Sequence, residues 1–287
     1  MRTAERLRYD VNCSILFTEL PLLERPAAAR AAGFTAVEFW WPFPDALPTD
    51  GQVDEFVASI ESAGVRLVGL NFFAGDMAAG DRGLVSWPGR VDEFRASVLT
   101  AVAIGQRLGC RAFNALYGNR LDGVDPRQQD AVAAENLAYA ADVVASAHGV
   151  VLVEPVSGAD RYPLRTARDA VEVVDRVNQA TGLDNCRLLA DLYHLTVNGD
   201  DVPAALAAYS ALVGHVQIAD APGRGEPGTG TLDLAGHLDQ LTEAGYDGWV
   251  GLEYKPSTAS GVSFGWLRPS QRAADLLEVA DTTGAAR

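Results

Sequence analysis

Cysteine is scarce in this chain, and the few cysteines present form no recognisable pattern. Three occur among 287 residues, inside apolar runs and without CxxC spacing: Cys13, Cys110 and Cys186. Disulfide frameworks and zinc sites need more numerous or more closely spaced cysteines, so this pattern indicates reduced, buried thiols.

Long apolar segments are absent as well. The opening residues, MRTAERLRYDVNC, contain no apolar core of a secretory signal, and no run of about 18 apolar residues occurs anywhere in the chain. The sequence therefore predicts neither secretion nor a membrane span, and we expect a cytoplasmic enzyme.

Positively charged residues are also few. Lysine and arginine number 23 against 38 aspartates and glutamates, which gives a formal charge of −15 and a pI of about 4.6. Such a field repels polyphosphate and anionic lipid, so we expect no nucleic-acid and no membrane partner. GxGxxG does not follow the first strand and GxxxxGK[ST] does not occur, which excludes the usual dinucleotide and P-loop sites.

What the chain does contain is a repeated unit of amphipathic helix, glycine and apolar strand. Six glycines follow helical patterns, where a helix end favours a residue with positive φ: Gly33, Gly64, Gly109, Gly149, Gly182 and Gly245. Eight strands are predicted, in the segments RYDVNC, TAVEF, VRLVGLN, CRAFNAL, VVLVEP, CRLLAD, ALVGHVQIAD and YDGWVGLEY. Strands this apolar are typical of parallel sheets with both faces buried.

Eight strands alternating with helices fit a closed (β/α)₈ barrel or an open doubly wound sheet. A polar residue lies at or near the carboxyl end of every strand: Asn12, Glu38, Asn71, Asn114, Glu154, Asp191, Gln217 and Glu253. A barrel brings these ends together at one mouth, whereas an open sheet spreads them along an edge, so we favour the α/β barrel. The length suits one such domain, residues 1–287, with an N-terminal extension at 1–7 and a flexible tail at 281–287.

Three carboxylates at these strand ends are the main candidates for a functional site. Glu154 ends an almost purely apolar strand, where burying an unpaired carboxylate is strongly unfavourable. Asp191 and Glu253 repeat this arrangement, and Gln217 adds an amide oxygen between them. Such an oxygen-only set suits Mg²⁺ or Mn²⁺ better than zinc. The alternative is that each carboxylate pairs with an arginine or caps a loop.

His194 is the candidate general acid, general base or substrate ligand among the four histidines. It follows Asp191 by three residues and should project over the same mouth of the barrel. We interpret His148, His215 and His237 as packing or surface groups.

Two loops and several polar residues are expected to contact substrate. The segment GRGEPGTG, 223–230, combines Arg224 with backbone amides available to an anion, and the long loop 71–90 carries aromatic residues able to cover a pocket. Lys255 shares the face of Glu253 if that strand continues, and a surface lysine is its alternative. The remaining substrate contacts that we predict are Asn71 and Asn114.

These segments resemble the hydroxypyruvate isomerase family of xylose isomerase-like barrels, in AGFTAVEFWWPF, AGDMAAGDRGL, ENLAYAAD, DLYH, HVQIADAPGRGEPGTG and GWVGLEYKP. The resemblance implies four metal ligands: Glu154, Asp191, Gln217 and Glu253. It also implies proton transfer by Glu154 and Glu253, and substrate contacts from His194 and Arg224. Two positions depart from the pattern, because Gln217 and Leu70 stand where related enzymes often have histidine.

The resemblance implies an isomerase that interconverts hydroxypyruvate and 2-hydroxy-3-oxopropanoate (tartronate semialdehyde) through a metal-stabilised enediolate. One glutamate would remove the carbon-bound proton, and the sequence does not say which. Arg224 would hold the substrate carboxylate. A 2-oxo-tetronate isomerase or a sugar epimerase with the same site stays open, as does a homo-oligomer. A histidine-rich endonuclease or a non-catalytic barrel fits the composition less well.

Overall fold

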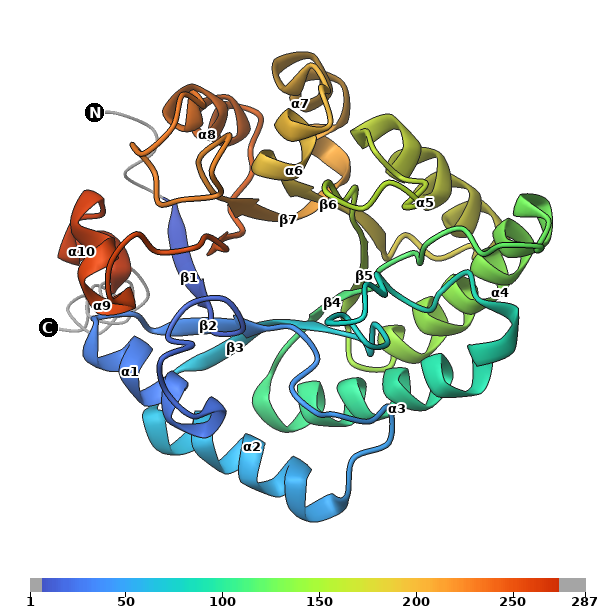
Figure 1. Cartoon of the computed structure of the whole chain (residues 1–287), viewed down its shortest axis with the longest axis horizontal. Helices are drawn as coiled ribbons and strands as arrows, with labels where there is room; N and C mark the ends of the chain where they lie inside the picture. The colour runs from blue at the N-terminus through green and yellow to red at the C-terminus, as the bar shows by residue number, and fades with distance from the viewer. Residues whose placement is uncertain (1–6, 274–287) are drawn as a thin grey trace, which may run out of the picture.

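The computed structural model describes residues 7–273, in which eight parallel strands close into a barrel in chain order. Each strand pairs with its sequence neighbours, and β1 pairs with β8 to complete the ring (Figure 1). The strands are β1 (Arg8–Asn12), β2 (Ala36–Phe39), β3 (Arg66–Asn71), β4 (Ala112–Asn114), β5 (Val150–Val153), β6 (Cys186–Asp191), β7 (Val213–Ile218) and β8 (Trp249–Leu252). The predicted barrel is confirmed, and the open sheet is excluded.

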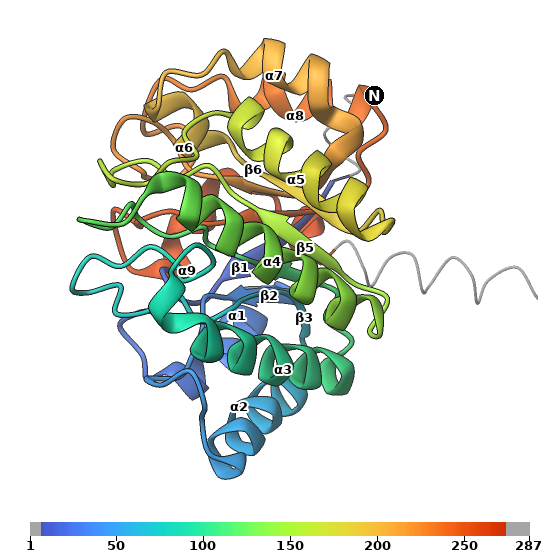
Figure 2. The ribbon, with the colours of Figure 1, turned by 90° about the vertical axis from the view of Figure 1, so that its right-hand side faces the viewer.

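Helices surround the barrel, as Figure 2 shows from the side. The buried residues of the longer helices are mostly apolar. They are α1 (Arg25–Ala31), α2 (Asp50–Ala63), α3 (Val91–Leu108), α4 (Pro126–Ala145), α5 (Ala167–Thr181), α6 (Leu192–Val197), α7 (Val202–Tyr209), α8 (Leu234–Glu243), α9 (Ser260–Ser263) and α10 (Pro269–Arg272). Short 3₁₀ turns lie at Leu22–Glu24, Pro88–Arg90, Ser210–Leu212 and Phe264–Trp266. In the described part of the chain, no helix is long and apolar enough to cross a membrane.

Helix α5 illustrates how the sequence specifies these elements. The Thr166 hydroxyl accepts the Asp169 N–H, and the Asp169 carboxylate accepts the Thr166 N–H, so both ends of this capping box are satisfied. Val171, Val174 and Val177 then recur at the spacing of one helix face and are buried. The three cysteines are likewise buried and unbonded, as predicted.

One of the six predicted helix-ending glycines does not have positive φ. The backbone of Gly149 lies outside that region, and His148 takes a φ of 53° instead. Gly149 is needed for a different reason, because a Cβ there would lie 2.7 Å from the Arg111 carbonyl oxygen. The glycine thus permits two chain segments to approach closely at the start of β5.

The proposed ends of the domain are described only in part. Leu7, the last residue of the predicted N-terminal extension 1–7, is buried in the core with 2% of its surface exposed. The predicted tail at 281–287 lies outside the described residues.

The loop between β3 and α3 packs tightly on the loop after β4. A Cβ at Gly83 (φ 103°) would lie 1.9 Å from the Leu116 carbonyl oxygen, whereas a Cβ at Gly80 (φ 106°) would meet nothing within 4 Å. Leu84 and Val85 follow and are fully buried. The long loop is therefore anchored to the barrel at Gly83.

This difference gives a matched pair of variants. Because both glycines have the same strained φ, Gly83→Ala should lose at least about 2 kcal/mol more unfolding free energy than Gly80→Ala, through the clash with Leu116. Urea denaturation of both variants measures the difference. Equal losses would mean that backbone strain, rather than the close approach, sets the cost.

Candidate functional site

A cavity of about 360 Å³ opens at the carboxyl ends of the strands. Its walls come from strand ends and from the segments that follow β2 to β8, as expected for a catalytic barrel. The lining residues are Trp40, Asn71, Met77, Ala78, Arg82, Leu116, Glu154, Val156, Ser157, His194, Arg224 and Glu253. The predicted loop 71–90 contributes Met77, Ala78 and Arg82, and so covers part of this cavity.

Glu154 lies directly after β5 and presents one oxygen to the cavity. Its Oε2 accepts a 2.7 Å hydrogen bond from the Asn114 amide, which comes from the end of neighbouring β4. Burial, with the negative charges of Glu253 and Asp191, raises the pKa of Glu154 well above its ordinary value. Asn114 therefore holds the glutamate in place rather than lining the cavity.

Asp191 and Gln217 each keep a buried oxygen without a partner. The Asp191 Oδ1 caps helix α6 by accepting the N–H groups of Tyr193 and His194, at 2.8 and 3.1 Å. Within the described residues, its Oδ2 has no hydrogen-bond partner, and neither has Gln217 Oε1. Burying an acceptor without a partner is unfavourable, so we expect each of these two oxygens to bind a cation or a hydrogen-bond donor.

Glu253 follows β8 and is held from two sides. Its Oε2 accepts from the Asn12 amide at 2.9 Å, and its Oε1 accepts from Nη2 of Arg224. Burial nevertheless raises the pKa of Glu253 to about 8, even though Arg224 lowers it. Glu253 is therefore a basic carboxylate poised near neutral pH.

His194 is a neutral imidazole with a fixed tautomer. Burial lowers its pKa to about 4, and Nδ1 accepts the backbone N–H of Ser157 at 3.0 Å. Nε2 consequently carries the proton, and it lies 3.6 Å from Asp191 Oδ2 and 3.9 Å from Glu154 Oε1. The histidine thus directs an N–H donor toward the carboxylates.

This donor set fits a metal ion. Glu154, Asp191 and His194 offer ligand atoms that all lie within 4.8 Å of one another, and the unpaired Gln217 oxygen supplies a further acceptor. Because His194 carries its proton on Nε2, the carboxylates and the amide are the better ligands. The buried acidic residues could therefore bind a metal.

Arg224 is tied to a carboxylate rather than left free for an anion. Besides its hydrogen bond to Glu253, its guanidinium lies 5.4 Å from the Tyr193 ring centre. Neighbouring carboxylates, Glu253 first among them, raise its pKa against the effect of burial. The sequence left open the alternative that each candidate carboxylate pairs with an arginine. Among the described residues, such a pair forms at Glu253 but not at Glu154 or Asp191.

Part of the 223–230 loop is unavailable to an anion, because two of its amides bind a carboxylate of the protein itself. The N–H groups of Gly228, Gly230 and Leu232 all point at the Asp220 carboxylate, at 2.8 to 3.0 Å. These bonds lower the pKa of Asp220 although burial opposes them. Two amides of the loop, those of Gly228 and Gly230, and the amide of Leu232 just beyond it are therefore occupied by Asp220.

The other predicted contacts divide between two places. Asn71 lines the central cavity. Lys255 is exposed and lines an adjoining cavity of about 670 Å³, because β8 ends at Leu252 and does not carry it to the face of Glu253. Trp40 and Arg224 separate the two cavities, since both line each of them.

Arg82 is a cavity residue that the sequence reasoning did not identify. Its Nη1 donates to the main-chain oxygens of Met77 and Asp81, at 3.0 and 2.7 Å, which fixes the guanidinium on the loop. It adds a second cation to the cavity beside Arg224. The feature of the sequence that could have identified Arg82 is a single arginine within the glycine-rich segment AGDRGL.

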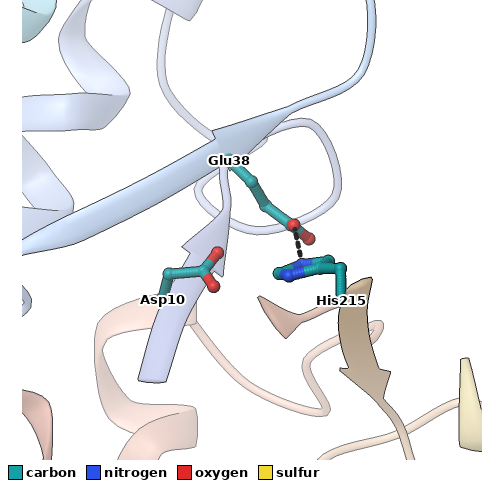
Figure 3. A group of neighbouring side chains, drawn as sticks. All are labelled: Asp10, Glu38 and His215. Atoms are coloured by element: carbon teal, nitrogen blue, oxygen red, sulfur yellow. Dashed lines mark hydrogen bonds and ion pairs between the residues drawn. The ribbon is translucent and has the colours of Figure 1, made fainter. Parts of the chain in front are cut away.

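His215 was also misinterpreted, because it belongs to a buried polar cluster beneath the site. Figure 3 shows Asp10, Glu38 and His215 converging from β1, β2 and β7, with His215 Nε2 2.7 Å from Glu38 Oε2. Alternation along a strand could have revealed this, since His215 shares the inward face of Gln217. Burial, followed by the charge of Glu38, raises the pKa of Asp10 well above its ordinary value.

Comparison with known proteins agrees with this geometry. A Streptomyces coelicolor protein named as a hydroxypyruvate isomerase is 57% identical over 272 residues, covering 93% of this chain and 98% of the relative. The hydroxypyruvate isomerase of Escherichia coli is 34% identical, covering 92% and 99%, and the 2-oxo-tetronate isomerase of Cupriavidus necator is 34% identical, covering 91% and 98%. A solved structure described as an AP endonuclease of family 2 from Brucella melitensis has a TM-score of 0.82 at 34% identity, covering 92% and 98%.

The fold, the site and these relatives together define an isomerase built on a (β/α)₈ barrel. The description of the matching family model is xylose isomerase-like TIM barrel, and the match spans residues 26–278. The chain belongs to this family, which confirms the resemblance found in the sequence.

Buried carboxyl groups with raised pKa values predict how the metal-free protein responds to pH. From pH 6.5 to 8, folded Glu253 keeps a proton that an unfolded glutamate, with its ordinary pKa of 4.5, has released. Folded stability must therefore fall as pH rises through this window, and His194, whose pKa is lowered from 6.5 to about 4 by burial, opposes this fall only near pH 6.5, where an unfolded histidine still holds part of its proton. Melting temperatures of chelator-treated protein should decrease from pH 6.5 to 8.

Two comparisons make this prediction specific. Glu253→Gln cannot titrate and should flatten the decline, and added Mg²⁺ or Mn²⁺ should raise the melting temperature most at pH 8. A metal-free melting temperature that stays constant over this range, with an identical profile for Glu253→Gln, would contradict the assignment.

Proposed function

We propose that this isomerase interconverts hydroxypyruvate and 2-hydroxy-3-oxopropanoate by proton transfer through an enediolate. The observation that carries the proposal is that two buried glutamates with raised pKa values, Glu154 and Glu253, line one cavity from different strands. The hydroxypyruvate isomerases among the relatives supply the substrate.

The reaction exchanges a carbonyl and a hydroxyl between adjacent carbons, so it needs a base, an acid and stabilisation of the enediolate. One glutamate takes the proton from carbon, and a proton returns to the neighbouring carbon. A pKa near 8 makes Glu253 a competent base and, once protonated, a competent acid at neutral pH. Arg224, which binds Glu253, keeps that carboxylate oriented.

A divalent cation, Mg²⁺ or Mn²⁺, would be held by the oxygens of Glu154, Asp191, Gln217 and Glu253. When bound, such an ion supplies positive charge that stabilises negative charge developing on substrate oxygens. The unpaired buried oxygens of Asp191 and Gln217 support this assignment. The oxygen-only character of the set favours a hard cation over zinc.

His194 and the two arginines would bind substrate. The Nε2–H of His194 can donate to a substrate oxygen without itself being charged, because its pKa is about 4. Arg224 and Arg82 are the cations of the cavity, and a guanidinium matches the geometry of a carboxylate. Asn71 supplies a further polar contact.

A 2-oxo-tetronate isomerase is the second candidate, favoured by the relative from Cupriavidus necator. It uses the same chemistry on a longer 2-oxo acid, so turnover on a panel of 2-oxo acids and neutral ketoses separates the two. Endonuclease activity finds less support, because three of the four histidines, His148, His215 and His237, are not among the residues that line the cavity, and the charge of −15 opposes DNA.

Glutamine substitutions test the two-glutamate mechanism. Glu154→Gln and Glu253→Gln keep the shape and a ligand oxygen but remove the basic site, so each should fold and lose at least about a hundredfold in kcat. Wild-type enzyme in D₂O should place solvent deuterium on the product carbon, which NMR detects. Near-wild-type kcat in a variant that binds metal normally would reduce that glutamate to a structural or ligand role.

Arginine substitutions test the anion contact. Arg224→Lys should lose at least about tenfold in kcat/KM for a 2-oxo acid, because a lysine cannot reproduce the guanidinium geometry, and Arg224→Ala should lose more. Lys255→Ala is the matched control, since Lys255 lines only the adjoining cavity. Unchanged kinetics for Arg224 variants together with a loss in Lys255→Ala would move the carboxylate contact to Lys255.

A further inference from the structure

The carboxylate of Glu38 lies at the end of β2, beneath the cavity, and it binds three donors. Its Oε1 accepts from the amides of Asn12 and Gln217, at 3.0 and 2.7 Å, and its Oε2 lies 2.7 Å from His215 Nε2. Only 3% of the residue is exposed. Glu38 is thus a fully paired acceptor enclosed by groups from β1 and β7.

The barrel makes room for this side chain. A Cβ at Gly251 of β8 would lie 2.6 Å from Glu38 Oε1, and a Cβ at Gly69 of β3 would lie 3.1 Å from Oε2. Any larger residue at Gly251 would displace the Glu38 carboxylate from its partners. Glycines on two strands therefore leave the space that Glu38 occupies.

A carboxylate in this position determines which way an amide turns. The Gln217 NH₂ donates to Glu38 Oε1, so the Oε1 of Gln217 faces away from Glu38. That Oε1 is the buried oxygen left without a partner. Asn12 is fixed in the same manner, because its Oδ1 accepts the Ser14 N–H at 3.0 Å and its NH₂ bridges Glu38 and Glu253.

We infer that Glu38 is a positioning residue that orients the Gln217 oxygen toward the cation, an inference that rests on the proposed metal site. Two residues of β7 thus bind the two oxygens of Glu38 on β2. His215 Nε2 lies at Oε2, and the Gln217 amide donates to Oε1. The partners that orient metal ligands are known to influence affinity strongly. Here the oriented ligand is an amide, which has two chemically different ends and binds a cation through only one of them.

In the cluster of Asp10, Glu38 and His215, the oxygens of Asp10 have no hydrogen-bond partner among the described residues, whereas Glu38 is fully paired. Both oxygens of Glu38 already accept hydrogen bonds from side-chain nitrogens, and the His215 nitrogen nearest to it is engaged at 2.7 Å (Figure 3). A cation would have to break these contacts, whereas the positioning role uses all of them.

A double-mutant cycle on Mn²⁺ affinity tests the role of Glu38. Glu38→Met removes both acceptor oxygens at similar length, and it should weaken Mn²⁺ binding by at least about tenfold in substrate-free protein. In a Gln217→Met background, where no amide remains to be oriented, the same change should cost less than about threefold. The cycle cancels the long-range effect of removing one negative charge, because that effect is present in both backgrounds.

Electron paramagnetic resonance of free Mn²⁺ gives the dissociation constants, and melting of the metal-free proteins confirms that they fold. Should Glu38→Met fail to fold, Glu38→Gln carries the same cycle with a smaller expected loss, since one acceptor oxygen remains. Asp10→Asn is the matched control, because Asp10 belongs to the same cluster but makes no hydrogen bond to Gln217; its Mn²⁺ affinity should stay within about threefold of wild type.

Two results would overturn the inference, and they are distinguishable. Equal losses in both backgrounds, or wild-type affinity in the Glu38 variants, would remove Glu38 from the positioning role while leaving the proposed function intact. Absence of Mn²⁺ binding by the wild-type protein would overturn the metal site itself, and the inference with it.

Discussion

The burial of negative charge at the barrel mouth is the constraint on which the rest of this site depends. Glu38, Glu154, Asp191 and Glu253 are all nearly inaccessible to solvent, in a protein that already carries a charge of −15. Removing a carboxylate from water is very unfavourable unless donors or a cation replace the solvent. Each of these side chains therefore needs partners, and the strand order of the barrel decides which partners it can have.

Some donors come from the adjacent strands, and others reach across the barrel. Asn114 of β4 binds Glu154 after β5, and Gln217 of β7 reaches across the barrel to Glu38 of β2. Asn12 of β1 binds both Glu38 and Glu253, which is possible only because β1 lies between β2 and β8 in the closed ring. An open sheet would separate those two carboxylates, so the barrel is a requirement of the site as well as its support.

The sequence predicted the positions of the carboxylates at the strand ends, because the pattern that indicates each position lies within a few consecutive residues. A carboxylate at the end of an apolar run, as at Glu154, has one plausible place in a barrel. Contacts that depend on loop conformation had no such signal. Arg224, whose own φ is 57°, binds Glu253, and the amides of Gly228 and Gly230 bind Asp220. His215 is an intermediate case, because strand alternation with Gln217 placed it inside the barrel, yet only the register with β2 brings it to Glu38.

Arg224 shows how one cation can serve both the protein and the proposed substrate. Its Nη2 donates a hydrogen bond to Glu253, and its Nε is buried without a hydrogen-bond partner among the described residues. A buried guanidinium N–H left unpaired is costly, so Arg224 keeps one strong donor that can bind a further acceptor. A substrate carboxylate would satisfy that donor while Glu253 keeps its own hydrogen bond. Substrate binding would then strengthen the pairing that orients the catalytic base instead of competing with it, since a guanidinium can bind two carboxylates through different edges.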